Sequence, residues 1–167
     1  MSWEVSLITL ALFVIALSLF GAWRGWSSRT RAQQQEIPAI PQALEQFGNL
    51  VSEVRCLYVA TTKSSNHLDR ITAHGLAFRG NAELRIFDNG LLITRDGERP
   101  IAIPSDKILD VKRSTAVIDK GVETDGLLTI DFESELSVHL RVKNQDQVLS
   151  TVSAIELLKK KREQFSE

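Results

Sequence analysis

A stretch of nineteen residues without a formal charge, from Val5 to Trp23, constrains this chain more than any other feature. Only Ser6, Thr9 and Ser18 carry polar side chains within it. At about 1.5 Å per residue, a helix of this length covers about 28 Å, close to the thickness of the hydrocarbon core of a bilayer. We therefore predict that residues 1–23 form a short N-terminal tail and a membrane-spanning helix.

The charges on the two flanks of this stretch predict its orientation. A single acidic residue precedes it, whereas arginines follow it directly. Positive charge marks the cytoplasmic side, and tryptophan rings favour the headgroup zone. The predicted membrane-anchor residues are Trp3, Trp23, Arg24, Trp26, Arg29 and Arg31. The chain is thus expected to be a single-pass protein of the cell membrane, with its N-terminus outside and its C-terminal domain in the cytoplasm.

Two alternatives for the apolar stretch are less favoured. A buried helix of a soluble domain would not need tryptophans and arginines at its ends. A cleaved signal peptide would carry a basic region before a shorter apolar core, and small residues at its cleavage site. Here Trp23 is bulky where a small residue would be needed.

The rest of the chain is long enough for one compact domain. Residues 24–43 read as a basic juxtamembrane arm and a linker, in which Pro38 and Pro41 favour an extended backbone from about Ile37. Residues 44–167 then form the predicted cytoplasmic domain. From Glu36 onward the chain has 17 Lys and Arg against 20 Asp and Glu, a net charge of −3. An acidic concentration between residues 119 and 135 would repel phosphates, so nucleic acid is not expected as a partner.

The hydrophobic pattern of this domain is mostly that of short strands. A short helix or turn is predicted from Gln42, because Leu44, Phe47, Val51 and Val54 recur at helical spacing. The predicted strands are 54–62, 82–87, 91–95, 100–104, 108–118, 126–133 and 136–143. The sequence Asp88-Asn89-Gly90 indicates a hairpin turn, and the prolines around residues 100–104 indicate an edge strand. Asn144 can cap a final amphipathic helix that ends near residues 159–162.

These elements predict an α+β, mainly β, fold. A small antiparallel β-barrel or sandwich of about seven strands follows the membrane helix, and the C-terminal helix covers the open end or corner of the sheet. This is the outline of a pleckstrin-homology-like (PH-like) domain.

Several short sequences carry a resemblance to a known family. The segments Tyr58-Val59-Ala60-Thr61-Thr62, Leu68-Asp69-Arg70-Ile71 and His74-Gly75-Leu76 resemble the actinobacterial family of membrane-anchored proteins with a PH-like domain. The resemblance implies one N-terminal span, a short linker and a PH-like domain, sometimes associated with transport or export. The sequence departs from the family at residues 137–141, around His139, where a threonine, glycine, phenylalanine and arginine run would be expected.

No motif in the sequence indicates catalysis, so the chain is not expected to be an enzyme. The histidines His67, His74 and His139 do not form a metal-binding motif, and Cys56 reads as a small buried hydrophobe. A metal held by His67, His74 and Asp69 is disfavoured, because histidines in a turn are mostly solvated. Nucleotide-binding glycine motifs are absent from the sequence. We therefore expect neither a cofactor nor a metal.

The expected function is a protein interaction. Asp69 and Arg70 either fix a tight turn or contact a partner, and the edge around Ile101 and Ile103 is a candidate docking place. Specific phosphoinositide recognition is not expected, because the loop after the first strand supplies only Lys63, with His67 and Arg70 beyond it. The main hypothesis is a scaffold or an accessory subunit of a membrane-associated assembly. The alternatives are a lipid- or small-ligand-sensing module and an accessory component of a transport system.

Overall fold

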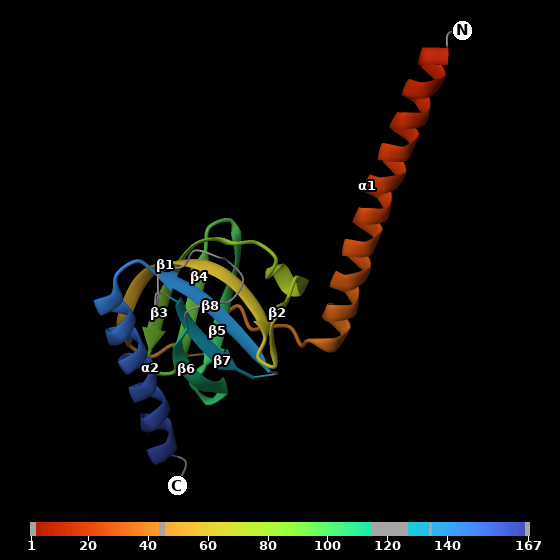
Figure 1. Ribbon diagram of the computed structural model, residues 1–167. Helices are drawn as coiled ribbons and strands as arrows, with labels where there is room; N and C mark the ends of the chain where they lie inside the picture. Colours follow the sequence, from red (N-terminus) through yellow and green to blue (C-terminus); the bar gives the residue numbers. More distant parts are fainter. Residues whose placement is uncertain (1–2, 44–45, 115–126, 134, 166–167) are drawn as a thin grey trace.

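The N-terminal helix projects away from a single folded domain (Figure 1). The structure, a computed structural model, describes residues 3–43, 46–114, 127–133 and 135–165. Helix α1 spans Trp3–Glu36 and ends just before Pro38, which disfavours helical backbone at the residue that precedes it. The helix therefore ends where the prolines of the predicted linker begin, and residues 38–43 are neither helix nor strand.

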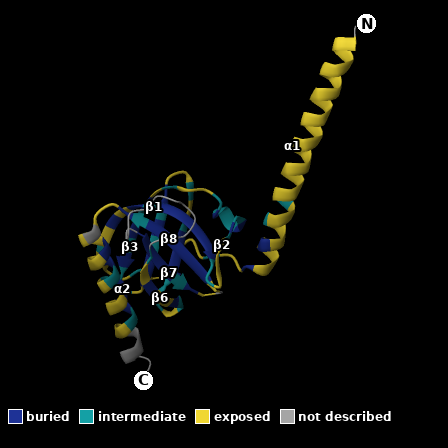
Figure 2. Ribbon diagram, viewed as in Figure 1, coloured by how far each residue is buried: buried dark blue, intermediate teal, exposed yellow. Residues whose placement is uncertain are grey.

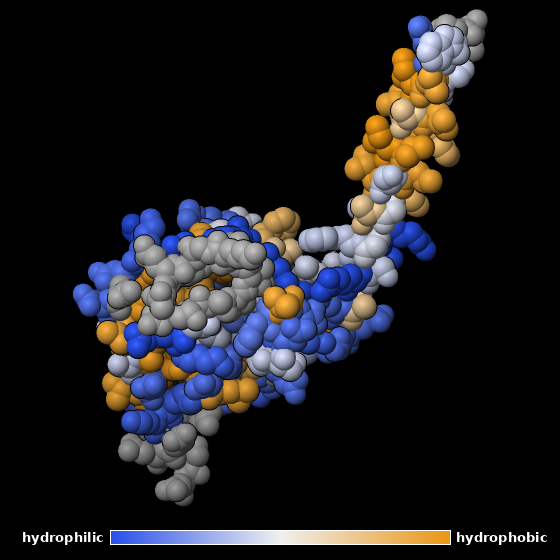
Figure 3. Space-filling model, in the orientation of Figure 1, coloured by the Kyte–Doolittle hydropathy of each residue, from blue (hydrophilic) through white to orange (hydrophobic). Residues whose placement is uncertain are grey.

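Helix α1 is long and apolar enough to cross a membrane. None of its most apolar window is buried against the domain, and the helix is exposed along nearly all of its length (Figure 2). A core helix of a soluble domain would bury one face, so this exposure disfavours that alternative. The space-filling view shows the apolar side chains gathered on the part of α1 that lies away from the domain (Figure 3).

The domain is built on one strongly curved antiparallel sheet. Its strands, in the order β5-β4-β3-β1-β8-β7-β6, pair side by side, and β2 pairs with the end of β1. The strands span Leu50–Lys63 (β1), Asn66–Arg70 (β2), Gly80–Phe87 (β3), Gly90–Arg95 (β4), Glu98–Pro104 (β5), Ile108–Ser114 (β6), Leu127–Phe132 (β7) and Leu136–Val142 (β8). The long β1 pairs with β3 along its first half and with β8 along its second half, so it joins the two halves of the sheet.

Helix α2, Gln145–Phe165, covers one corner of the sheet. The Asp146 amide donates to Asn144 Oδ1 at 2.9 Å, so the predicted cap is observed. Val148, Ile155 and Leu158 are buried, and α2 packs on β6, β1 and β8 and on the short 3-10 helix η2, Ser105–Lys107 (Figure 1). The predicted mainly β fold with a C-terminal helix is confirmed.

Two local predictions need correction. One strand was not predicted: Asn66–Arg70 pairs with β1 where only turn residues were expected, so the described residues form eight strands. The helix or turn predicted from Gln42 contains no helix in its described residues, and β1 already begins at Leu50. Tertiary contacts determine this backbone: the rings of Phe47 and Phe87 lie 4.8 Å apart, and Gly48 has a φ of +72°. Leu44 and residues 115–118 of the predicted 108–118 strand lie outside the described residues.

Candidate functional site

The last turns of α1 dock on the segment between β1 and β3, and Gln33 is the centre of this junction. Gln33 is 6% exposed, although its neighbours Gln34 and Gln35 are exposed. Its Nε2 donates to the Arg70 carbonyl at 3.1 Å, and its Oε1 accepts from the Thr72 amide at 2.8 Å and from Thr72 Oγ1 at 2.9 Å. One buried side-chain amide thereby satisfies two backbone groups of the domain.

Further contacts surround this amide along α1. Arg29 forms an ion pair with Asp69 at 2.9 Å, and the Thr30 and Thr72 hydroxyls lie 3.1 Å apart. Lys63 donates to the Glu36 carboxylate, which raises the pKa of the lysine. Because successive turns of α1 each contact the domain, the junction fixes the helix in direction as well as in position.

The chain just after α1 extends the junction into the core. Ile37 is 4% exposed and belongs to the main hydrophobic core. His74 Nε2 lies 2.9 Å from the Ile37 carbonyl, and His74 has a φ of +55°, a left-handed conformation that is uncommon for a residue with a side chain. His74 belongs to the 3-10 helix η1, Ala73–Gly75, which contacts α1 beside the sheet (Figure 1).

The side chains of Arg95 and Tyr58 bond to the backbone of η1 and of the residue after it. The Arg95 guanidinium lies over the Tyr58 ring, 4.7 Å from its centroid, and donates to the carbonyls of Gly75 and Arg99. Tyr58 Oη donates to the Leu76 carbonyl at 3.2 Å. Burial raises the pKa of Tyr58, so the phenol stays protonated as a donor. The segment between β1 and β3, residues 64–79, contacts α1 and forms a helix-binding segment. It is thus attached to the core of the domain.

The structure brings the predicted anchor and interaction residues together only at this junction. Arg29 contacts Asp69, whereas Trp3, Trp23 and Trp26 are exposed on α1, as are Arg24 and Arg31. Arg70 donates through Nη2 to the carbonyls of Val59 and Ala77. Asp69, Arg70 and Lys63 therefore each have an intramolecular partner.

The predicted docking edge around Ile101 and Ile103 lies on β5, an edge strand of the sheet. Their side chains are only 2% and 0% exposed, because both residues face the core from β5. The Ala102 amide on the same strand donates to the Pro41 carbonyl at 2.8 Å. The chain's own linker therefore covers part of this edge, which is the usual protection of an edge strand.

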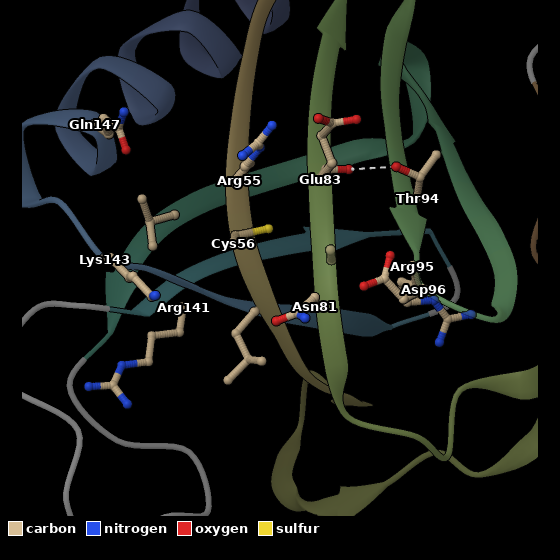
Figure 4. Close-up of a pocket in the computed structure, with 13 residues that line it drawn as sticks. Arg55, Cys56, Asn81, Glu83, Thr94, Arg95, Asp96, Arg141, Lys143 and Gln147 are labelled. Atoms are coloured by element: carbon tan, nitrogen blue, oxygen red, sulfur yellow. Dashed lines mark hydrogen bonds between the residues drawn. The ribbon is translucent and has the colours of Figure 1, made fainter.

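Away from the Gln33 junction, the domain has a cavity of about 950 Å³ that is lined by residues of strands β8, β1, β3 and β4 (Figure 4). Its lining includes four cations, Arg55, Arg95, Arg141 and Lys143, and two acidic residues, Glu83 and Asp96. Glu83 is paired with Arg85 at 2.6 Å. Within the described parts of the chain, no carboxylate lies within ion-pairing distance of Arg55, Arg141 or Lys143. Basic residues therefore outnumber acidic residues in the lining of the cavity, beside the start of α2.

The remaining titratable groups of interest are buried and electrically neutral. Burial raises the pKa of the Cys56 thiol in the cavity wall to about 12, so this cysteine is protonated near neutral pH. His139 lies between Thr62 and Thr129, with its ring nitrogens 2.9 and 3.0 Å from their hydroxyls, and burial lowers its pKa to about 4. In the described ranges no three His, Cys, Asp or Glu side chains gather as a metal site.

Sequence reasoning missed the most important residue of the junction. Gln33 lies in a run of three glutamines, and nothing in that run distinguishes the buried one. Arg55 is far in sequence from Arg141 and Lys143, and the pairing of β1 with β8 brings them to one side of the domain. The proline-bounded segment after α1 was the only local signal for the docked linker.

One family model matches the chain, and the solved structures similar to it are remote. No curated protein matches the chain. Among solved structures, the C-terminal domain of an unknown protein from Leishmania infantum is 16% identical with a TM-score of 0.46, covering 65% of this chain and 84% of that one. An activated truncation of Vav1 is 11% identical with a TM-score of 0.47, and the match covers 79% of this chain but only 32% of that one. The family model described as bacterial PH domain-like matches residues 34–156, and the chain belongs to that family.

Proposed function

We propose that this protein is a non-enzymatic, single-pass membrane protein whose cytoplasmic PH-like domain binds another protein, as a scaffold or an accessory subunit of a membrane-associated assembly. The observation that carries the proposal is the junction around Gln33, which connects an apolar helix directly to the domain. A flexible tether would only concentrate the domain near a membrane, whereas a docked helix also orients it. A fixed orientation is useful to a module that must present one face to a partner.

The orientation across the cell membrane follows from the charges beside the apolar stretch. Arg24, Arg29 and Arg31 lie on the domain side, and the described part of α1 has Glu4 on the other side. Positive charge is retained on the cytoplasmic side, so the domain is assigned to the cytoplasm. The apolar stretch from Val5 to Trp23 has no ionisable side chain for a transport pathway, which favours an accessory role over transport by this chain alone.

The cavity across β8, β1, β3 and β4 is the proposed partner-binding face. Its cations complement an acidic segment of a partner. A carboxylate of that segment can pair with Arg55 or with Arg141 through two hydrogen bonds. The protonated Cys56 thiol in its wall is a poor nucleophile, which supports binding rather than catalysis.

Site-specific photo-crosslinking in intact membranes tests this function. A photoreactive residue is placed at Asn81 or Asp96, which line the cavity, and at Leu109, which is 58% exposed and does not line it. The proposal predicts one discrete protein adduct from the cavity positions, and its loss when Arg55 and Arg141 are changed to glutamate. Identical adducts from Leu109, or adducts that survive the charge reversal, would contradict it.

A lipid- or small-ligand-sensing role is the second candidate, because the cavity volume is in the range of small-molecule sites. Native mass spectrometry of the full chain released from membranes distinguishes the two. A retained small molecule that the Arg55→Glu and Arg141→Glu changes remove would favour sensing, whereas a chain of bare mass would favour the protein partner.

A further inference from the structure

Two large apolar side chains of the helix-binding segment are exposed. Leu68 in β2 is 78% exposed, the highest value among the large hydrophobic side chains that the structure describes. Phe78, just before β3, is 64% exposed. Both lie in the segment between β1 and β3 that docks on α1. Neither side chain contributes to the buried core, so the packing of the domain does not explain why large apolar residues stand at these exposed positions.

The junction fixes where these side chains lie relative to the anchor. A small cavity of about 250 Å³ is lined by Trp26, Arg29, Leu68, Arg70, Thr72 and Ala77. Trp26 follows the apolar stretch by three residues, a rise of about 4.5 Å, which places its ring in the headgroup zone when α1 spans a bilayer. Leu68 shares this cavity with Trp26, and Phe78 directly follows Ala77 of the same lining. Leu68 therefore lies near the depth of the tryptophan anchor, and Phe78 is one residue away from the same lining.

The polar groups around them have partners in the protein. Asp69 is paired with Arg29, Arg70 is bonded to the Val59 and Ala77 carbonyls, and Thr72 is bonded to Gln33. The segment therefore presents two large apolar side chains beside charged groups that are already paired within the protein. An apolar surface at headgroup depth matches the boundary between headgroups and acyl chains, where large apolar residues are favourably placed.

We propose that Leu68 and Phe78 enter the interface of the same membrane that α1 spans, giving the domain a second, headgroup-independent membrane contact. The proposal rests on the proposed function only in that α1 must be in a bilayer. The molecule that contacts this apolar patch, made of Leu68 and Phe78, is lipid, because Leu68 lines the same cavity as Trp26 of the membrane anchor. With α1 fixed by the Gln33 junction, this second contact would set the tilt of the domain against the membrane.

Fluorescence quenching in lipid nanodiscs tests the proposal with the full chain. In a Cys56→Ala background, the variants Leu68→Cys and Phe78→Cys carry an environment-sensitive dye. Leu157→Cys is the matched control, because Leu157 is 65% exposed on α2 and does not belong to the patch. Spin-labelled lipids with the label near the headgroup end of the acyl chain are added at increasing fractions, in uncharged and in anionic nanodiscs.

The expected result is a blue shift and loss of most of the dye emission at positions 68 and 78, in both nanodisc types, and neither effect at position 157. Aqueous emission at 68 and 78 would overturn the proposal. A blue shift without quenching would also overturn it, since another protein copy would then cover the patch. A dye at Leu17→Cys, inside the apolar stretch, separates the two ideas: quenching there with none at 68 and 78 leaves the anchor intact and refutes only the second contact.

Discussion

Replacing Gln33 by alanine removes three hydrogen bonds between α1 and the domain at once. Two of them engage backbone groups, the Arg70 carbonyl and the Thr72 amide, that lose their partner when the side chain is gone. At about 1 kcal/mol per hydrogen bond, the variant should weaken the docked state by about 3 kcal/mol, which is roughly a hundredfold in the docked-to-undocked ratio. The rest of the domain, which does not contact Gln33, should keep its stability.

Amide hydrogen exchange of the full chain in nanodiscs measures this loss. The Thr72 amide is the reporter, because its hydrogen bond goes to Gln33 Oε1 itself. We expect exchange of peptides that contain residues 70–72 to accelerate strongly in Gln33→Ala, while peptides from β3 and β4 stay protected. Gln34→Ala is the matched control, since Gln34 is exposed on the same turn. Unchanged exchange in Gln33→Ala, or equal acceleration in Gln34→Ala, would refute the junction as the holding contact.

Three further predictions concern charge, pH and the single thiol. The Arg29–Asp69 pair has side chains 61% and 30% exposed, so Arg29→Ala should weaken docking by about 0.5 kcal/mol, whereas Arg29→Asp should weaken it more and be rescued by adding Asp69→Arg in the same exchange assay. The pKa of His139 is about 4 in the folded protein against an ordinary value of 6.5, so the unfolded chain takes up the proton first as the pH falls. The free energy of unfolding should therefore fall by about 3 kcal/mol as the pH drops from 6.5 to 4. Thermal unfolding measures this loss, which should be smaller in His139→Gln. Cys56, with its pKa near 12, should resist thiol reagents at mildly alkaline pH and react only on unfolding; rapid labelling of the folded chain would contradict its burial.

The elements with strong local signals could be predicted from the sequence. Residues 82–87 alternate between core and surface, and Asp88-Asn89-Gly90 supplies the turn, so the β3–β4 hairpin forms where local chemistry indicates. The C-terminal helix likewise follows from its cap and its apolar stripe. These features depend on neighbours in sequence, which is why the amino-acid sequence alone indicates them.

The elements that depend on distant contacts could not be predicted. β2 is held by only two residue pairs with β1, Thr62 with Arg70 and Lys63 with Asn66, and its own sequence has no alternation to reveal it. The helical spacing around Phe47 was misleading, because the ring packs on Phe87 from a segment forty residues away. The buried Gln33 is a feature of the same kind, since Thr72 supplies its partners only after the domain has folded.

A distance measurement between the membrane helix and the domain tests the central claim most directly. Spin labels at Ser28 on α1 and at Leu157 on α2, both exposed positions, are introduced into the full chain in lipid nanodiscs, with Cys56 replaced by alanine. A docked helix predicts one narrow distance distribution, which broadens when Gln33→Ala is added. A distribution that is already broad in the unaltered junction would show a flexible tether and contradict the account.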